Sequence, residues 1–132
     1  MLSGRYRTQM LTRHWSSACS GACLAPGCSG CDETLEHILL HCPAYSQTRS
    51  MLHRMWTTAT NYQAQNLASS ALQNSSSYFL QFVLDASVIP EVIISVQEHG
   101  VELLSAIFHL TRSWCFAIHR ERAKFQGRWK FC

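Results

Sequence analysis

Cysteine and histidine residues gather in one short segment of the sequence. Five of the seven cysteines lie between positions 19 and 42, and they include the spacing Cys23-x4-Cys28-x8-His37-x4-Cys42. Zinc takes four thiolate or imidazole ligands in a tetrahedron, and a cysteine pair on a turn with a His/Cys pair at a helix end meets that need. Three thiolates and one imidazole leave no open position. The pattern therefore predicts a structural Zn²⁺ site.

The ligand set has alternatives. Cys31 can replace the second cysteine of the pattern, Cys19 is a spare thiol, and His41 can compete with the last cysteine. The alternative to a metal is a loop of free thiols. However, residues 16–31 are mostly Ser, Gly and Cys, and such a segment stays irregular unless something external organises it.

The sequence offers little for catalysis. Two aspartates and six glutamates leave few carboxylates for two-metal phosphoryl chemistry or for paired acid and base catalysis. The run His37-Ile-Leu-Leu-His41 has the histidine spacing of a zinc protease, but Ile38 stands where the general base should be. No glycine-rich phosphate loop or nucleophile elbow occurs. We therefore expect no enzymatic activity.

The length and composition are those of one small domain. The chain has 132 residues, of which 47% are hydrophobic and 14% charged, so a modest core is possible. The hydrophobic spacing predicts a mostly α-helical protein with an irregular, zinc-stapled Cys/His knob near the N-terminus. Three parts are predicted: residues 1–58 with a basic helix, the zinc motif and a following helix; a polar linker at 59–77; and a helical segment with a basic tail at 78–132.

Individual helices can be predicted from their apolar spacing and their ends. The clearest helix runs from Val101 to about residue 126, with Phe108 counted among its core side chains. Pro90 begins a helix that Gly100 ends. Asp32 is the predicted N-cap of a helix that ends at Pro43. Further helices are predicted at 5–15 and 44–58. The main apolar stripe of the last helix is Leu103, Ile107, Leu110, Trp114 and Ile118.

Positive charge is concentrated at the two ends of the chain. The net charge is +3, but residues 111–132 hold six basic side chains against one acid, and residues 55–110 hold four acids and no Lys or Arg. A basic tail suits a polyanionic partner, RNA or DNA, bound without sequence preference. The predicted contact residues are Arg112, Arg120, Arg122, Lys124, Arg128 and Lys130, with Trp129 stacking on a base and Arg5, Arg7 and Arg13 in support.

The N-terminal residues lack the apolar stretch of a secretory signal. No run approaches the roughly 18 apolar residues of a membrane helix. We therefore expect an intracellular protein, nuclear or cytoplasmic and not secreted, with no membrane partner. In that reducing setting the cysteines should not form disulfides.

Several runs spread along the sequence form a further pattern: Ser3-Gly-Arg-Tyr-Arg-Thr8, the cysteine cluster, Thr34-Leu-Glu-His37, His41-Cys42-Pro43, Leu110-Thr-Arg-Ser-Trp114-Cys115, His119-Arg-Glu-Arg122 and Gly127-Arg-Trp129. Together they resemble the carboxy-terminal end of a non-LTR retrotransposon reverse transcriptase of the RTE-like kind. The resemblance covers nearly the whole chain apart from residues 61–77. Its most specific part is the Cys/His spacing with the flanking Thr-Leu-Glu-His, and the pattern of the last helix is a second match.

The resemblance implies a zinc-binding tail that helps a parent enzyme hold its RNA template and target DNA. The metal ligands it implies are Cys23, Cys28, His37 and Cys42. The endonuclease and polymerase domains of that family have no counterpart in this sequence, so their activities are not expected here. Two rival hypotheses remain: a helical protein-interaction domain that uses the apolar stripe of the last helix, and a translated retroelement remnant without function.

Overall fold

The structure, a computed structural model, describes residues 22–23, 25–28 and 31–125. Helices dominate these residues, and extended pairing within them is limited to an isolated bridge between Ala22 and Asp32. The expected class, a mostly α-helical domain with a Cys/His knob near the N-terminus, is confirmed. In chain order the elements are η2 (His37–His41), η3 (Pro43–Tyr45), α2 (Ser46–Thr57), α3 (Tyr62–Leu72), α4 (Ser76–Asp85), η4 (Ala86–Val88), α5 (Pro90–His99) and α6 (Val101–Ala123).

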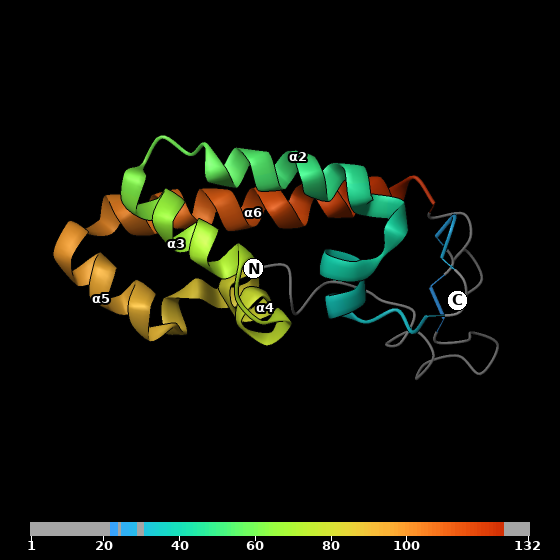
Figure 1. Cartoon of the computed structure of the whole chain (residues 1–132), viewed down its shortest axis with the longest axis horizontal. Coiled ribbons are helices and arrows are strands. Elements are labelled where there is room, and N and C mark those ends of the chain that lie inside the picture. The colour runs from blue at the N-terminus through green and yellow to red at the C-terminus, as the bar shows by residue number, and fades with distance from the viewer. Residues whose placement is uncertain (1–21, 24, 29–30, 126–132) are drawn as a thin grey trace.

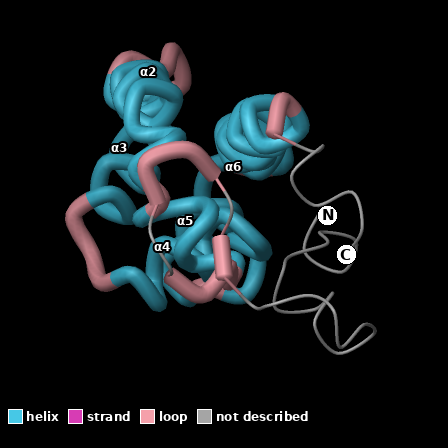
Figure 2. The backbone as a smooth tube through the Cα atoms, turned by 90° about the vertical axis from the view of Figure 1, so that its right-hand side faces the viewer, coloured by secondary structure: helices cyan, strands magenta, loops and turns pink. Residues whose placement is uncertain are grey.

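Helix α6 is the central helix around which the other helices pack. It runs along the long axis of the molecule beside α2, and it also packs against α3, α4 and α5 (Figure 1). In the view along that axis α2 and α6 are seen end on (Figure 2). The predicted apolar stripe of α6 is buried throughout, but Phe108 is only half-buried. The placement of Phe108 in the core was therefore wrong, because it lies at the edge of the stripe.

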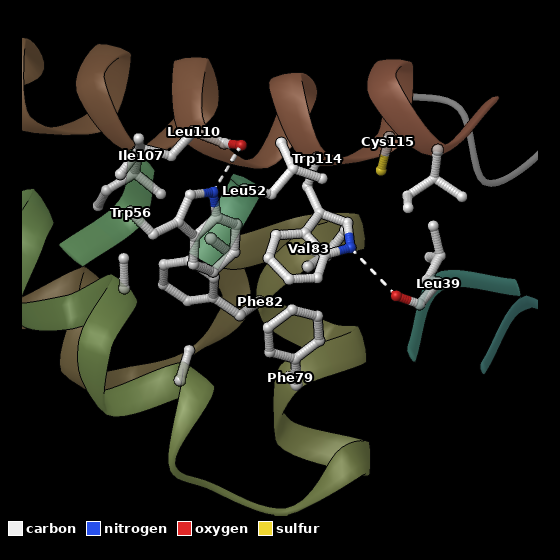
Figure 3. Packing of buried hydrophobic residues seen from close by; sticks show 14 of the residues in the cluster. Leu39, Leu52, Trp56, Phe79, Phe82, Val83, Ile107, Leu110, Trp114 and Cys115 are labelled. Atoms are coloured by element: carbon white, nitrogen blue, oxygen red, sulfur yellow. Dashed lines mark hydrogen bonds between the residues drawn. The ribbon is translucent and has the colours of Figure 1, made fainter. Parts of the chain in front are cut away.

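Four aromatic rings form the centre of the core. The Trp56 ring lies 5.5 Å from Phe79, 5.5 Å from Phe82 and 4.9 Å from Trp114, measured between ring centroids (Figure 3). Both indoles also find hydrogen-bond acceptors, as buried tryptophans normally do. Trp56 Nε1 donates to the Leu110 carbonyl, and Trp114 Nε1 donates to the Leu39 carbonyl, each at 3.2 Å. The cluster thus joins α2, α4, α6 and η2.

The predicted linker at 59–77 is wrong, because residues 62–72 form helix α3. Its N-cap is Asn61, whose side chain accepts a hydrogen bond from Ala64 N at 3.0 Å. Ala64, Ala68 and Ala71 face the core and are fully buried. Alanines at this spacing let α3 approach its neighbours closely, although they bury little apolar area.

The two flanking parts do not fold around separate cores. Buried residues from the Cys/His knob, such as Ile38 and Leu39, belong to one cluster with Phe82 of α4 and Ile107 of α6. The parts on either side of α3 therefore share one core. The buried side chains between residues 31 and 125 belong to one hydrophobic cluster, so this part of the chain packs as a single body.

Several helix ends follow the predictions. Helix α5 begins at Pro90 and is followed by Gly100, whose φ of 86° is a conformation that L-residues with side chains rarely adopt. Helix α2 falls inside the predicted helix at 44–58. The predicted N-cap Asp32 is wrong: the side chain of Thr34 accepts a hydrogen bond from His37 N at 3.1 Å. The helix predicted at 5–15 lies outside the described residues.

Helix α6 is long and apolar enough, by length and composition alone, to cross a membrane. The bent pair formed by residues 76–88 and 90–99 passes the same test jointly. The expectation that no segment approaches a membrane helix needs this correction. In this structure the apolar stripe of α6, including Leu103 and Ile118, lies in the core, which accounts for part of the hydropathy of the helix.

Candidate metal centre

Two of the predicted ligands flank a tight turn. Pro26 and Gly27 are its central residues, and Cys28 N closes it with a 3.1 Å hydrogen bond to the carbonyl three residues earlier. Gly27 has a φ of 80°, which a type II turn requires after a proline. Beyond the turn the chain folds back, since Cys23 N donates to the Cys31 carbonyl at 2.7 Å. This reversal brings the Cys23 and Cys28 thiols together.

The other two predicted ligands lie at the ends of a π-helical turn. Cys42 N donates to the His37 carbonyl at 2.7 Å, an i to i+5 bond that defines η2. In a regular α-helix, residues five apart point about 140° away from each other, because each residue turns the helix by about 100°. The wider π turn corrects this angle and brings His37 and Cys42 to one side. Such turns are rare and often found at functional sites.

The four side chains converge with the dimensions of a metal site. Cys23 Sγ lies 3.8 Å from Cys42 Sγ, and Cys28 Sγ lies 3.3 Å from His37 Nε2. All four ligand atoms lie within 4.8 Å of one another. Tetrahedral ligands with a Zn–S distance of about 2.3 Å are separated by about 3.8 Å. The group can hold a metal ion, and its sulfur spacing is far too long for a disulfide bond.

The alternative ligands predicted from the sequence stay outside this group where the structure describes them. Cys31 and His41 are exposed and are not among the four converging side chains. Cys115 is buried in the core, and burial raises its thiol pKa to about 11. Cys19 lies outside the described residues. Among the candidate ligands that the structure describes, the four that the fold brings together are thus the predicted four.

Burial favours the neutral forms of the cysteine and histidine side chains in the group when no metal is bound. Cys23 is 3% exposed and Cys42 is fully buried. Desolvation raises the pKa of both thiols and lowers the pKa of the His37 imidazole. A divalent cation changes this balance, because its charge stabilises thiolates and its coordination requires neutral imidazole. Binding of a metal ion would therefore release thiol protons, and burial favours the neutral, ligating form of His37.

Two charged side chains that are not among the four predicted ligands lie near the group. Glu33 is fully buried, and its carboxylate forms a two-point ion pair with Arg122 of α6, at 2.7 Å from Nη2 and 3.3 Å from Nε. Arg49 of α2 lies close enough for Cys42 and His37 to be influenced by its charge. A zinc ion with three thiolates and one imidazole carries one net negative charge, which a neighbouring guanidinium can offset.

The predicted nucleic-acid contacts divide into four kinds. Arg112 and Arg120 are exposed on α6 and available to a partner. Arg122 is not, because its guanidinium is bound to the buried Glu33; its predicted role was wrong for that reason. Lys124 is exposed but forms a 3.0 Å ion pair with Glu121. Arg128, Trp129, Lys130 and the basic residues Arg5, Arg7 and Arg13 lie outside the described residues.

Comparison with protein-family models, with characterised proteins and with solved structures gives no match to this chain. The case for the site therefore depends on its own geometry. The observations that carry it are the convergence of four ligand atoms, their burial, and the two unusual backbone turns that position them.

Glu33 and Arg49 were not predicted as parts of the site. No local pattern links Glu33 to Arg122, 89 residues away. Arg49 gave a clearer signal, since it lies in the first turn of a helix that begins four residues after Cys42.

Proposed function

We propose that this protein is a structural-zinc domain that binds nucleic acid without sequence preference. The single observation that carries the zinc part is the convergence of Cys23, Cys28, His37 and Cys42 within 4.8 Å. Three thiolates and one imidazole suit zinc, and four protein ligands leave no position for a substrate. The ion holds the knob against the helices and takes part in no reaction.

The nucleic-acid part of the proposal is supported by the exposed face of α6. Arg112, Phe116 and Arg120 recur every four residues, so they share one face of the helix. Phe116 is 46% exposed, unusual for a large apolar side chain. His109 and His119 flank this face, and no acid occurs between residues 109 and 120. Arginines with an exposed aromatic suit phosphates and the faces of unstacked bases.

The parent context of this domain is also a proposal. The resemblance to the carboxy-terminal region of a non-LTR retrotransposon reverse transcriptase supports a role in holding RNA or DNA beside a polymerase. The closed ligand set fits that supporting role, since such a tail contributes binding and no chemistry of its own.

A second candidate function is protein binding, in a form different from the one predicted. The apolar stripe of α6 is buried, so it cannot serve a partner. However, large apolar side chains are exposed on and around α5: Val88 is 54% exposed, Ile93 42%, Ile94 56% and Val101 73%. Exposed apolar groups in this number favour a protein contact at this end of the domain.

Metal analysis of the full chain purified in reductant, followed by titration with oligonucleotides, tests the main proposal. We expect one zinc per chain, lost in Cys42→Ser and retained in the matched control Cys31→Ser, whose thiol is exposed outside the group. Chelation should disorder the knob, since structural zinc supplies roughly 10–16 kcal/mol of apparent binding free energy in small sites. A metal content near zero would overturn the zinc assignment. If the zinc-loaded protein does not bind oligonucleotides at low salt, that result would favour protein binding as the function.

A further inference from the structure

A cavity of about 560 Å³ opens between η2, α2, the start of α4, and α6. Its volume is in the range of ligand-binding pockets. Phe79 and Trp114, which lie together in the core (Figure 3), contribute to its apolar side. The polar side is formed by the end of η2, by one face of α2 and by the first residue of α4. This cavity is separate from the exposed face of α6 that carries Arg112 and Arg120.

The polar lining of the cavity is cationic. Arg49 and His53, four residues apart on α2, share it with His41 at the end of η2. Not one of the described residues that line the cavity is an aspartate or a glutamate. A cavity with one permanent positive charge, two imidazoles and no carboxylate favours an anion.

Arg49 has unused hydrogen-bonding capacity. Its Nη1 atom is buried and has no hydrogen-bond partner among the described residues. An unpaired buried guanidinium nitrogen is costly, and so points to a group that the polypeptide itself does not supply. The guanidinium offers five N–H donors. Because Arg49 also lines the cavity, a ligand bound there can meet its guanidinium.

The start of α4 adds a further attraction for anions. Ser76, the first residue of the helix, lines the cavity. The N-cap Ser75 accepts a hydrogen bond from Tyr78 N at 3.2 Å. The backbone N–H groups of Ser76 and Ser77, in the first turn, have no acceptor within the helix. The positive end of the helix dipole therefore lies beside the same cavity as Arg49.

We propose that this cavity is a phosphate-binding site, held by Arg49 with His41, His53 and the N-terminus of α4, for a backbone phosphate of a bound nucleic-acid strand. The inference rests on the proposed nucleic-acid function and extends it from the exposed face of α6 to a specific pocket. Arginine binds phosphate with two parallel hydrogen bonds. The imidazoles and the helix N–H groups complete the contacts to the remaining oxygens.

The test uses the zinc-loaded full chain with two probes, inorganic phosphate and a single-stranded oligothymidylate of fifteen nucleotides. The variant Arg49→Gln is compared with Arg54→Gln, which removes an exposed arginine from the same helix outside the cavity. We expect Arg49→Gln to weaken oligonucleotide binding about tenfold and Arg54→Gln to weaken it less than twofold. Phosphate should shift the amide resonances of Ser76 and Ser77 in the wild type and in Arg54→Gln, but not in Arg49→Gln.

A second variant guards against loss of the fold or of the metal. His41→Gln/His53→Gln leaves Arg49 in place, and zinc content and helical circular dichroism are measured for every protein. Oligonucleotide affinity reduced in this variant at full zinc content supports the site. Equal affinity in Arg49→Gln and Arg54→Gln overturns the site and leaves the proposed function standing. Binding of inorganic phosphate without any binding of the oligonucleotide overturns the proposed function and, with it, the assignment of the cavity to a nucleic-acid strand.

Discussion

Glu33 and Arg122 form an ion pair that connects the Cys/His knob to the last turn of α6. The carboxylate is fully buried and the guanidinium side chain is 13% exposed, with the two closest atoms 2.7 Å apart. Because the pair lies between the segment that carries the candidate metal ligands and α6, it fixes where the knob sits on the helical body.

Replacing Arg122 with Gln should destabilise the protein strongly. The change leaves the buried Glu33 carboxylate without its cation, and losing one partner of a buried pair costs about 3–5 kcal/mol. Chemical denaturation of the zinc-loaded protein measures the effect. The matched control is Lys124→Gln, which breaks the exposed pair with Glu121 and should cost less than about 1 kcal/mol. Equal losses in the two variants would contradict the structural role of Arg122.

The Trp114 side chain is the second link between the knob and α6. It is 3% exposed and donates to the Leu39 carbonyl in η2. Trp114→Ala should lower the free energy of unfolding by about 3–5 kcal/mol, as for other buried large-to-small changes. Phe116→Ala, on the exposed face of the same helix, is the control and should cost less than about 1 kcal/mol. A loss below about 1 kcal/mol for Trp114→Ala would show that the aromatic cluster is not a core.

The long helix and the ligand set could be predicted because their signals are local. The stripe of α6 repeats at the helical period over about four turns, Pro90 and Gly100 fix the ends of α5, and the candidate metal ligands are set by spacing along 20 residues. In each case the residues that carry the signal are near each other in the sequence. Helical periodicity, helix capping and metal-ligand spacing all act over short stretches of the chain.

The rest of the fold depends on contacts that have no local signal. Helix α3 was taken for a linker because its buried positions, Ala64, Ala68 and Ala71, carry little apolar area. Their burial becomes visible only when the neighbouring helices are in place. Likewise, Arg122 belongs to a basic run that suggests a nucleic-acid contact, and only the three-dimensional structure shows that it neutralises Glu33.

Zinc affinity should fall steeply as the pH is lowered. Burial raises the thiol pKa of Cys23 and Cys42, so both are protonated near neutral pH without metal, and each releases a proton on binding. At least two protons released lower the affinity by about a hundredfold per pH unit. Burial lowers the pKa of the His37 imidazole, so it contributes less to this change between pH 7.5 and about 6.5 than a free histidine would. Competition with a chelator at these two pH values measures the change, and a loss below about tenfold would contradict it.

Nucleic-acid binding should be weak, salt-sensitive and nearly indifferent to sequence. Non-specific binding of this kind has a Kd of about 10⁻⁴–10⁻⁶ M at physiological salt, and three to five phosphate contacts give a slope of log K against log salt of roughly −2 to −5. Arg112→Glu/Arg120→Glu, both at exposed positions of α6, should make that slope shallower by about 1.4–1.8.

Arg122 must stay intact in this experiment, because its loss would disturb the fold through Glu33. The matched control reverses Arg54, an exposed arginine on α2, and should leave the slope nearly unchanged. Phe116→Ala should weaken binding to single strands without altering the slope, since stacking releases no counterions. A slope in Arg112→Glu/Arg120→Glu equal to that of the wild type, at full zinc content, would show that the exposed face of α6 does not meet the phosphates. The basic residues outside the described part of the chain would then be the next candidates to test.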